Sequence, residues 1–503
     1  MKKPLKKRER RERLTRILAI ALVAVLIGGI VLSTLVSAFA EEMPARDSYE
    51  LNIEYMEDEQ ALHITQRLVY HNETGSDLDR VVFYAAGNMF RRESALMYEN
   101  DVIEAVFPEG YAPAGIDLQS VTVDGEDADW GYQSDEMFLR VACNLAPGEA
   151  CSFEFEYYLL LSRSCAMIGA FDTDVRLSAF YFIPALFFDG EFYPYAPLQF
   201  TRWVSTTAAD YAVTLSIPDQ YLPAATGSET LLSTENHTSV WRFEAENAHE
   251  FALSFGRRYR ETTAQTDSGV TVRALSNDRS GAARALEYAV KVIDLYESWL
   301  GEFPVDQIDL IQSDYPAGAL SFPGAIWLPS DILADNDTLE AALRFCLAQQ
   351  YIGLTAYPEP VADAWLSDVP CAYLSLLAVE ELKGYDAFLT ALNDQVLAAL
   401  NMTVPGGLYI TAAANLFTAE EYDIIVRDRG TVVMHELRVA MGREDFIAGL
   451  RCFYEMGLET DLLGEYDFVA AFDSVTGGSW EDFITEWLFN VDDYIGQQIE
   501  FYE

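Results

Sequence analysis

Cys346, Asp368 and Cys371 are the residues whose types and spacing come nearest to a chemical site. Asp368 and Cys371 lie three residues apart, so a helix would present both on one face. Thiolates and carboxylates bind divalent metals, and a metal site built from these three residues is therefore one alternative. Against it, a zinc site needs a closed set of Cys or His ligands, which this grouping lacks.

Cys346 is also a candidate nucleophile. A catalytic thiol needs a lowered pKa and a partnered base, often a histidine. No histidine is near Cys346 in the sequence, so we expect a buried, inert thiol instead. The chain has five histidines, at His63, His71, His237, His249 and His435.

His435 and Glu436 form the first half of His-Glu-x-x-His, in which two histidines on one helix face bind zinc and the glutamate is a general base. Position 439 is Val, so the second ligand is missing. We expect His435 to face solvent or to cap a helix.

The stretch from Phe345 to Asp368 has the frame of a zinc site without its ligands. Phe345 and Gln349 are four residues apart, and eighteen residues separate Gln349 from Asp368, which ends the sequence Trp-Leu-Ser-Asp. This frame resembles the zinc helix of the aminopeptidase N-like gluzincin metallopeptidases, where His-Glu-x-x-His is followed at this distance by Trp-Leu-x-Glu-Gly. The resemblance places the metal ligands at Phe345, Gln349 and Asp368 and the general base at Cys346. A phenyl ring cannot bind a metal, an amide is a poor zinc ligand, and one carboxylate makes no zinc site.

A second family motif is altered in the same way. The family's Gly-Ala-Met-Glu-Asn strand resembles Gly318-Ala319-Leu320-Ser321-Phe322. Its glutamate holds the amine of the substrate, and Ser321 stands at that position. The resemblance implies that the other four residues line a groove.

The third motif is the transition-state tyrosine, which x-Lys/Arg-Gly usually follows. It corresponds to Arg427 in Arg427-Asp428-Arg429-Gly430. Tyr422 lies five residues upstream, and we expect it to project from a different part of the turn. Because an unpaired buried carboxylate is costly, we hypothesise that Arg427 pairs with Asp368 and supplies the positive charge that zinc would supply.

These losses predict an inactive relative of the family's zinc aminopeptidases. General acid–base help is worth about 10²–10⁴-fold in rate and a metal several kcal/mol more, and both are missing. The catalytic positions Cys346, Ser321 and Arg427 are then degenerate, and no cofactor is expected, although the active relatives use zinc. We expect the groove to bind a peptide or an envelope protein. Two alternatives stay open: a metallopeptidase with a relocated site, and a structural envelope protein.

The charge of the chain is strongly acidic, with 80 acidic against 33 basic residues and a formal net charge of −47. Nine of the basic residues lie within the first sixteen positions. A body this acidic repels nucleic acid, which excludes that class of partner.

The basic start is followed by an uncharged run from Ile17 to Ala40, which is long enough to span a bilayer. Ala38-Phe39-Ala40 also resembles a signal-peptidase site. We expect either a single-pass membrane protein with an extracytoplasmic body or a protein secreted after cleavage near Ala40.

The periodicity of the remaining chain predicts an α+β multidomain fold. Residues 45–258 alternate with a period of two and predict a β-sandwich-like domain, after residues 1–44. Residues 259–503 begin with a short strand candidate and continue as helices, which suits a thermolysin-like α/β and helical domain. Cys143 and Cys151 flank a turn-like segment, and a disulfide across the mouth of a hairpin is one possibility there.

Overall fold

The computed structural model describes residues 46–488, except for 94, 95, 97, 99, 134, 135, 196–203 and 402–407. In this part of the chain, no helix is long and apolar enough to cross a bilayer. The longest described helix, α3 (Arg279–Leu300), carries charged residues along its length, whereas a membrane span needs about 20 apolar residues. This finding contradicts the prediction of a single-pass membrane protein. Ile17 to Ala40, on which the prediction rested, lies outside the described residues.

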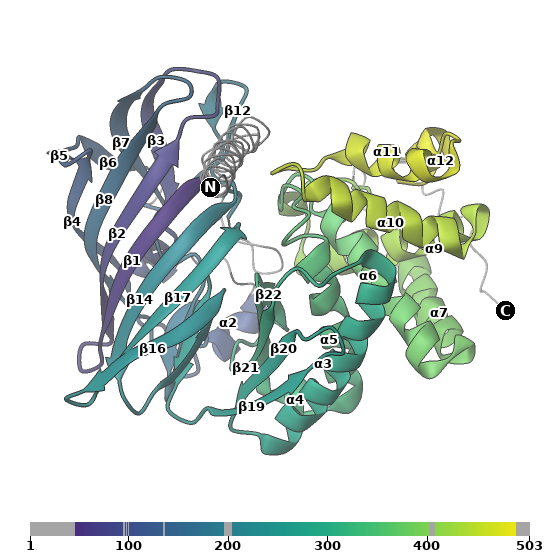
Figure 1. Ribbon diagram of the computed structural model, residues 1–503, viewed down its shortest axis with the longest axis horizontal. Coiled ribbons are helices and arrows are strands. Elements are labelled where there is room, and N and C mark those ends of the chain that lie inside the picture. Colours follow the sequence, from purple (N-terminus) through teal and green to yellow (C-terminus); the bar gives the residue numbers. More distant parts are fainter. Residues whose placement is uncertain are drawn as a thin grey trace, which may run out of the picture. The chain divides into compact units, whose positions relative to one another are not determined.

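The first half of the chain is built on a large sheet of eight strands (Figure 1). Its central strand β1 (Asp47–Met56) buries Tyr49, Leu51, Ile53 and Tyr55 on one face, as its period of two predicts. β1 pairs in parallel with β14 and antiparallel with β2. On one side of β1 lie β14 (Ala209–Pro218), β17 (Thr238–Ala248) and β16 (Ser228–Glu235), in this order outward. On the other side lie β2 (Ala61–His71), β8 (Ala150–Leu160), β4 (Gly115–Val123) and β5 (Glu126–Asp127).

Two four-stranded sheets complete a sandwich-like β-domain, because their inward side chains join the same hydrophobic core as the large sheet. One sheet has the order β15 (Leu222–Ala225), β18 (Leu253–Gly256), β10 (Asp174–Leu177), β9 (Ile168–Phe171). The other has the order β11 (Ile183–Pro184), β3 (Leu78–Tyr84), β7 (Phe138–Leu145), β6 (Trp130–Gln133). A short ribbon of β12 (Phe187–Phe188) and β13 (Glu191–Phe192), helix α2 (Asn100–Val106) and a 3-10 turn (Ala86–Arg91) connect them.

The disulfide considered as one possibility between Cys143 and Cys151 is not formed. Cys143 lies on β7 and Cys151 on β8, and these strands belong to different sheets instead of forming one hairpin. Both cysteines are free thiols.

The second half begins with a five-stranded sheet and continues as helices. The strand order is β19 (Arg260–Gln265), β20 (Thr271–Ser276), β21 (Gln307–Ser313), β23 (Ala325–Pro329), β22 (Leu320–Phe322), so the short β22 forms an edge. Helix α3 has Asp278 as its N-cap, whose side chain accepts a hydrogen bond from the Ser280 backbone, and Gly301 as its C-cap.

The rest of the described second half is mainly helical, as its periodicity predicts. Its helices are α4 (Ser330–Ala334), α5 (Asn336–Tyr351), α6 (Trp365–Lys383), α7 (Tyr385–Asn401), α8 (Ala419–Glu421), α9 (Arg429–Met441), α10 (Arg443–Gly457), α11 (Glu465–Thr476) and α12 (Glu481–Leu488). Between α8 and α9 lies a π-helix (Tyr422–Asp428), and a 3-10 turn (Ala414–Leu416) precedes α8.

The predicted α+β class and the order of a β-domain before an α/β and helical part are confirmed. The buried side chains fall into two clusters, one centred on the sandwich and one on the helices, but the first also includes Leu275, Ile311 and Trp327 from the second half. The domain limits at residues 44 and 258 stay predictions.

Candidate functional site

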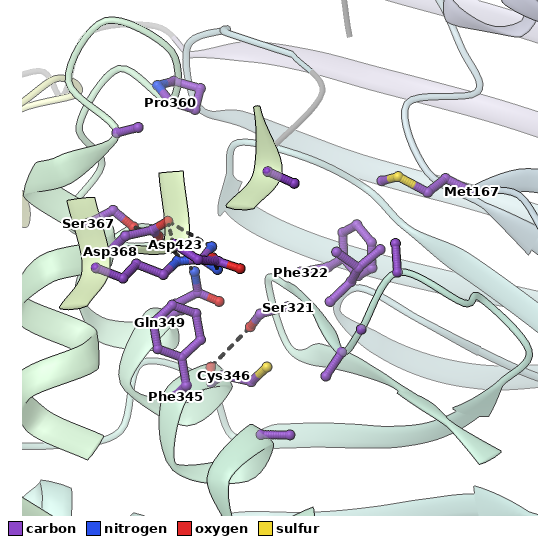
Figure 2. A pocket seen from close by; sticks show the side chains of 18 of the residues that line it. Met167, Ser321, Phe322, Phe345, Cys346, Gln349, Pro360, Ser367, Asp368 and Asp423 are labelled. Atoms are coloured by element: carbon purple, nitrogen blue, oxygen red, sulfur yellow. Dashed lines mark hydrogen bonds and ion pairs between the residues drawn. The ribbon is translucent and has the colours of Figure 1, made fainter. Parts of the chain in front are cut away.

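A cavity of about 800 Å³ lies where the motif residues of the second half come together. Its walls come from β22 and the loop before it, from α5, from the start of α6 and from residues 419–427 (Figure 2). Val102, Met167 and Glu250 of the β-domain also line it. All the residues predicted to form the groove, Gly318, Ala319, Leu320 and Phe322, are on its wall.

Asp368 is the centre of the polar network in this cavity. Its carboxylate is only 9% exposed and accepts hydrogen bonds on both oxygens. Arg427 donates from Nε and Nη2 to Oδ2 at 3.2 and 2.9 Å. The Tyr422 hydroxyl donates to Oδ2 at 3.1 Å, and Gln349 Nε2 donates to Oδ1 at 3.3 Å. The hypothesis that Arg427 pairs with Asp368 is confirmed.

Arg427 holds two carboxylates, because its Nη1 also donates to Asp423 Oδ1 at 2.6 Å. Its guanidinium lies 5.2 Å from the centre of the Phe345 ring and 5.3 Å from that of Tyr422. Burial lowers the pKa of Arg427, but the carboxylates of Asp368 and Asp423 outweigh it and raise the pKa above its ordinary value. Arg427 therefore carries a fixed positive charge.

Tyr422 contradicts the prediction that it projects from a different part of the turn. The α-helical spacing assumed there places residues five apart about 140° from each other. Residues 422–428 instead form a π-helix, whose hydrogen bonds span five residues, so that Tyr422 and Arg427 stand about one turn apart. Both side chains thus reach the same carboxylate.

Two local features shape this segment, one at its start and one at its end. Thr418 and Glu421 form a capping box that starts the helix, with reciprocal hydrogen bonds between side chain and backbone. Gly430, just after the π-helix, lies so close to α6 that a Cβ there would be 2.4 Å from Val369 Cγ2. Only glycine permits this approach without a shift.

Cys346 is buried, at 1% exposure, and burial raises the pKa of its thiol to about 12. Such a thiol is protonated at neutral pH, which confirms the prediction of an inert group. Ser321 donates its hydroxyl hydrogen to the Cys346 carbonyl at 3.0 Å and accepts from Gln350 Nε2 at 2.7 Å. Ser321 is therefore held inside the protein's own network.

The residues at the three ligand positions do not fit a zinc ion. Phe345 offers a ring, Gln349 already donates to Asp368, and the Asp368 carboxylate is occupied by a cation of the chain itself. Within the described residues, no group of three or more His, Cys, Asp or Glu side chains could hold a metal ion. The alternative site from Cys346, Asp368 and Cys371 is therefore wrong, and Cys371 Sγ instead donates to the Ile352 carbonyl at 3.1 Å.

His435 is buried, which contradicts the prediction that it faces solvent or caps a helix. Its Nδ1 lies 2.9 Å from the Tyr373 hydroxyl, and its ring contacts Phe388. Burial lowers the pKa of His435 to about 4, so the ring is neutral at physiological pH. It lies on α9 and does not line the cavity.

Three acidic residues of the cavity were missed by the sequence argument. Asp423 lies four residues before Arg427, a spacing at which opposite charges pair on helices, so it could have been found. Glu420 has no comparable signal. Glu250 comes from the β-domain, far away in the sequence, and only the fold brings it here.

Comparisons with known proteins agree with the fold. No family model matches the chain. It is 25% identical over 274 residues to aminopeptidase N of Lactococcus lactis subsp. lactis, covering 50% of this chain and 32% of the relative. It is 24% identical over 204 residues to endoplasmic reticulum aminopeptidase 2 of Bos taurus, covering 37% of this chain and 21% of the relative. The matches thus span about a third or less of these curated proteins.

Solved structures match over nearly the whole chain. An M1 zinc metallopeptidase from Deinococcus radiodurans superposes with a TM-score of 0.66 at 16% identity, covering 91% of this chain and 96% of that one. A variant of the same enzyme bound to a Tyr-Ser-Ala substrate gives 0.63 at 17% identity, covering 88% of this chain and 94% of that one.

Proposed function

Because the chain is an aminopeptidase N-like relative of the M1 metallopeptidases, we propose that it binds peptides in the cavity without hydrolysing them. The observation that carries the proposal is the ion pair between Arg427 and Asp368. Asp368 is the only one of the three ligand positions with a metal-binding side chain, and the guanidinium occupies it.

The pair replaces a removable metal with a charge that belongs to the chain. Zinc polarises a carbonyl and activates a bound water, whereas a guanidinium carries a positive charge and donates hydrogen bonds but does not activate water. The general-base position is occupied by Cys346, whose thiol is protonated. The position of the amine-binding glutamate is occupied by Ser321, which has no carboxylate. The positions that correspond to the family's metal ligands and general base therefore lack a group that could generate the attacking hydroxide.

The cavity supports the binding half of the proposal. A volume of about 800 Å³ falls within the range of small-molecule and peptide pockets. Its wall combines apolar side chains such as Phe322 and Leu320 with a few fixed polar groups around Asp368. Such a surface can hold part of a peptide in one orientation.

The test measures metal, turnover and binding on one preparation, purified without chelator and without a metal-affinity tag. We expect far less than one zinc per chain, no hydrolysis of aminoacyl amides, and binding of the tripeptide Tyr-Ser-Ala by calorimetry. The variant Ala319→Trp should fill the cavity and abolish binding. The matched control Ala440→Trp, on an exposed position of α9, should bind as the parent does.

Two results would overturn the proposal. Close to one zinc per chain together with hydrolysis would mean an active metallopeptidase. Binding of no peptide, or binding that Ala319→Trp leaves intact, would leave a structural protein or place the ligand elsewhere.

A further inference from the structure

We infer that the cavity selects a cationic ligand with an apolar end, whose positive charge lies against an acidic wall formed by Glu420 and Asp423. The inference rests on the proposed function, since it names the ligand class for the same cavity. It goes beyond that function because it assigns the charge, the orientation and the residues that select the ligand.

The charges that line the cavity do not balance. Four carboxylates, those of Glu250, Asp368, Glu420 and Asp423, face a single guanidinium, that of Arg427. The carboxylate of Asp368 is paired with Arg427 inside the protein. The net negative charge of the cavity lining therefore comes from the other three residues.

Two of these three carboxylates are open to a ligand. Asp423 is 56% exposed although one of its oxygens accepts from Arg427, and Glu420 is exposed one turn before it. Glu250 differs, because it is only 4% exposed and accepts a hydrogen bond from the Ser178 hydroxyl at 2.5 Å. A cation entering from solvent thus meets Glu420 and Asp423 first.

The opposite wall is apolar. Figure 2 shows Phe322 and Met167 across the cavity from Asp368 and Asp423. Leu320 and Val102 line the cavity as well. A ligand that contacts the acidic wall with a positive group and the apolar wall with a hydrocarbon or aromatic group matches both sides of the cavity.

The part of the cavity wall formed by β22 carries no negatively charged side chain that could bind the amine of a peptide. Ser321, on β22, has its hydroxyl engaged by the Cys346 carbonyl and by Gln350. Ser321 therefore provides no group that would require the ligand to have a free N-terminal amine. A lysine or arginine side chain within a blocked peptide can supply the cation that Glu420 and Asp423 attract.

The charge of the whole chain acts in the same direction. A formal net charge of −47 raises the local concentration of cations and repels anionic ligands before any contact forms. Because exposed charges are screened by salt, the preference is best measured at low ionic strength.

The test uses three peptides that differ only in charge: acetyl-Lys-Phe-amide, acetyl-Gln-Phe-amide and acetyl-Glu-Phe-amide. Calorimetry should give the highest affinity for the lysine peptide and the lowest for the glutamate peptide. Glu420→Gln and Asp423→Asn should each weaken the lysine peptide by up to about fivefold, as expected for an exposed charge pair, and leave the glutamine peptide unchanged. Glu444→Gln, which removes an exposed charge from α10 outside the cavity, is the matched control.

The outcomes separate this inference from the proposed function. Equal affinity for the three peptides, or a preference for glutamate, would overturn the inference while leaving peptide binding intact. A lysine preference that neither Glu420→Gln nor Asp423→Asn reduces would refute the acidic wall. Binding of none of these peptides nor of Tyr-Ser-Ala would overturn both.

Discussion

The guanidinium of Arg427 donates two hydrogen bonds to one carboxylate oxygen of Asp368, from Nε at 3.2 Å and from Nη2 at 2.9 Å. The pair joins the π-helix to α6 across the wall of the cavity. Both its contribution to the free energy of unfolding and its effect on zinc binding at Asp368 can be measured.

Arg427→Leu should destabilise the fold, because it leaves the carboxylate of Asp368 buried without its counter-ion. We expect a loss of about 2 kcal/mol, between the values for buried and exposed pairs, since the guanidinium is 27% exposed. Adding Asp368→Asn should recover part of the loss, which denaturant unfolding would measure. A double variant as unstable as the sum of the two single variants would mean that the pair contributes nothing.

Tyr422→Phe should cost about 1 kcal/mol through the lost hydrogen bond to Asp368. Tyr466 is 80% exposed, so Tyr466→Phe makes the same chemical change without a buried contact and should be neutral. Thermal unfolding of both variants gives the comparison. A neutral Tyr422→Phe would show that Arg427 and Gln349 satisfy the carboxylate alone.

Gly430→Ala should destabilise by about 1–3 kcal/mol, because the new methyl group meets Val369. Val369→Ala in the same chain should relieve the clash and restore part of the stability. Gly131→Ala is the control, since a Cβ there has nothing within 4 Å. Equal unfolding curves for all of these variants would show that α9 can move away from α6 freely.

Introducing Phe345→His and Gln349→His together should not create a tight zinc site while Arg427 remains. The guanidinium would still occupy Asp368, and its positive charge would repel the ion. Adding Arg427→Tyr should raise zinc affinity by more than tenfold, which competition with a chelating dye would report. Tight binding by the two-histidine variant alone would show that Arg427 does not exclude the metal.

Asp428 should make stability depend on pH near neutrality. Burial and then Asp423 raise its pKa to about 7, against the opposing effect of Arg427, compared with an ordinary value of about 3.9. The folded protein therefore holds this proton more tightly than the unfolded chain. The stability it contributes is complete below about pH 4 and is lost as the pH rises to 7.

Replacing that carboxyl isolates the effect from other acids. Asp428→Asn should match the parent below about pH 4 and exceed it in stability at pH 8, as measured by denaturant unfolding at each pH. An unchanged difference between the two proteins across this range would assign the carboxyl an ordinary pKa.

The sequence was sufficient for the parts of the site that depend on spacing along one helix. Phe345 and Gln349 come from α5 at four-residue spacing, and their place on the cavity wall follows from that period. The pairing of Arg427 with Asp368 could be inferred because a buried carboxylate needs a cation.

Features that depend on long-range packing or on unusual backbone geometry were not predictable. Residues 422–428 contain no residue type that signals a π-helix, so the position of Tyr422 was inferred wrongly from α-helical spacing. His435 was expected at the surface because its partners, Tyr373 and Phe388, come from other helices. Glu250 reaches the cavity only through the folding of the β-domain.

The π-helix sets the position of Arg427 relative to Tyr422 through chain length as well as through residue type. Deleting one residue between them would allow an ordinary α-helical turn, in which residues four apart stand about 40° from each other, so both side chains could still reach Asp368. An α-helix one residue shorter could thus build the same contacts. Alignments that compare relatives column by column, without following helical phase, would assign the partner of Asp368 to the wrong position.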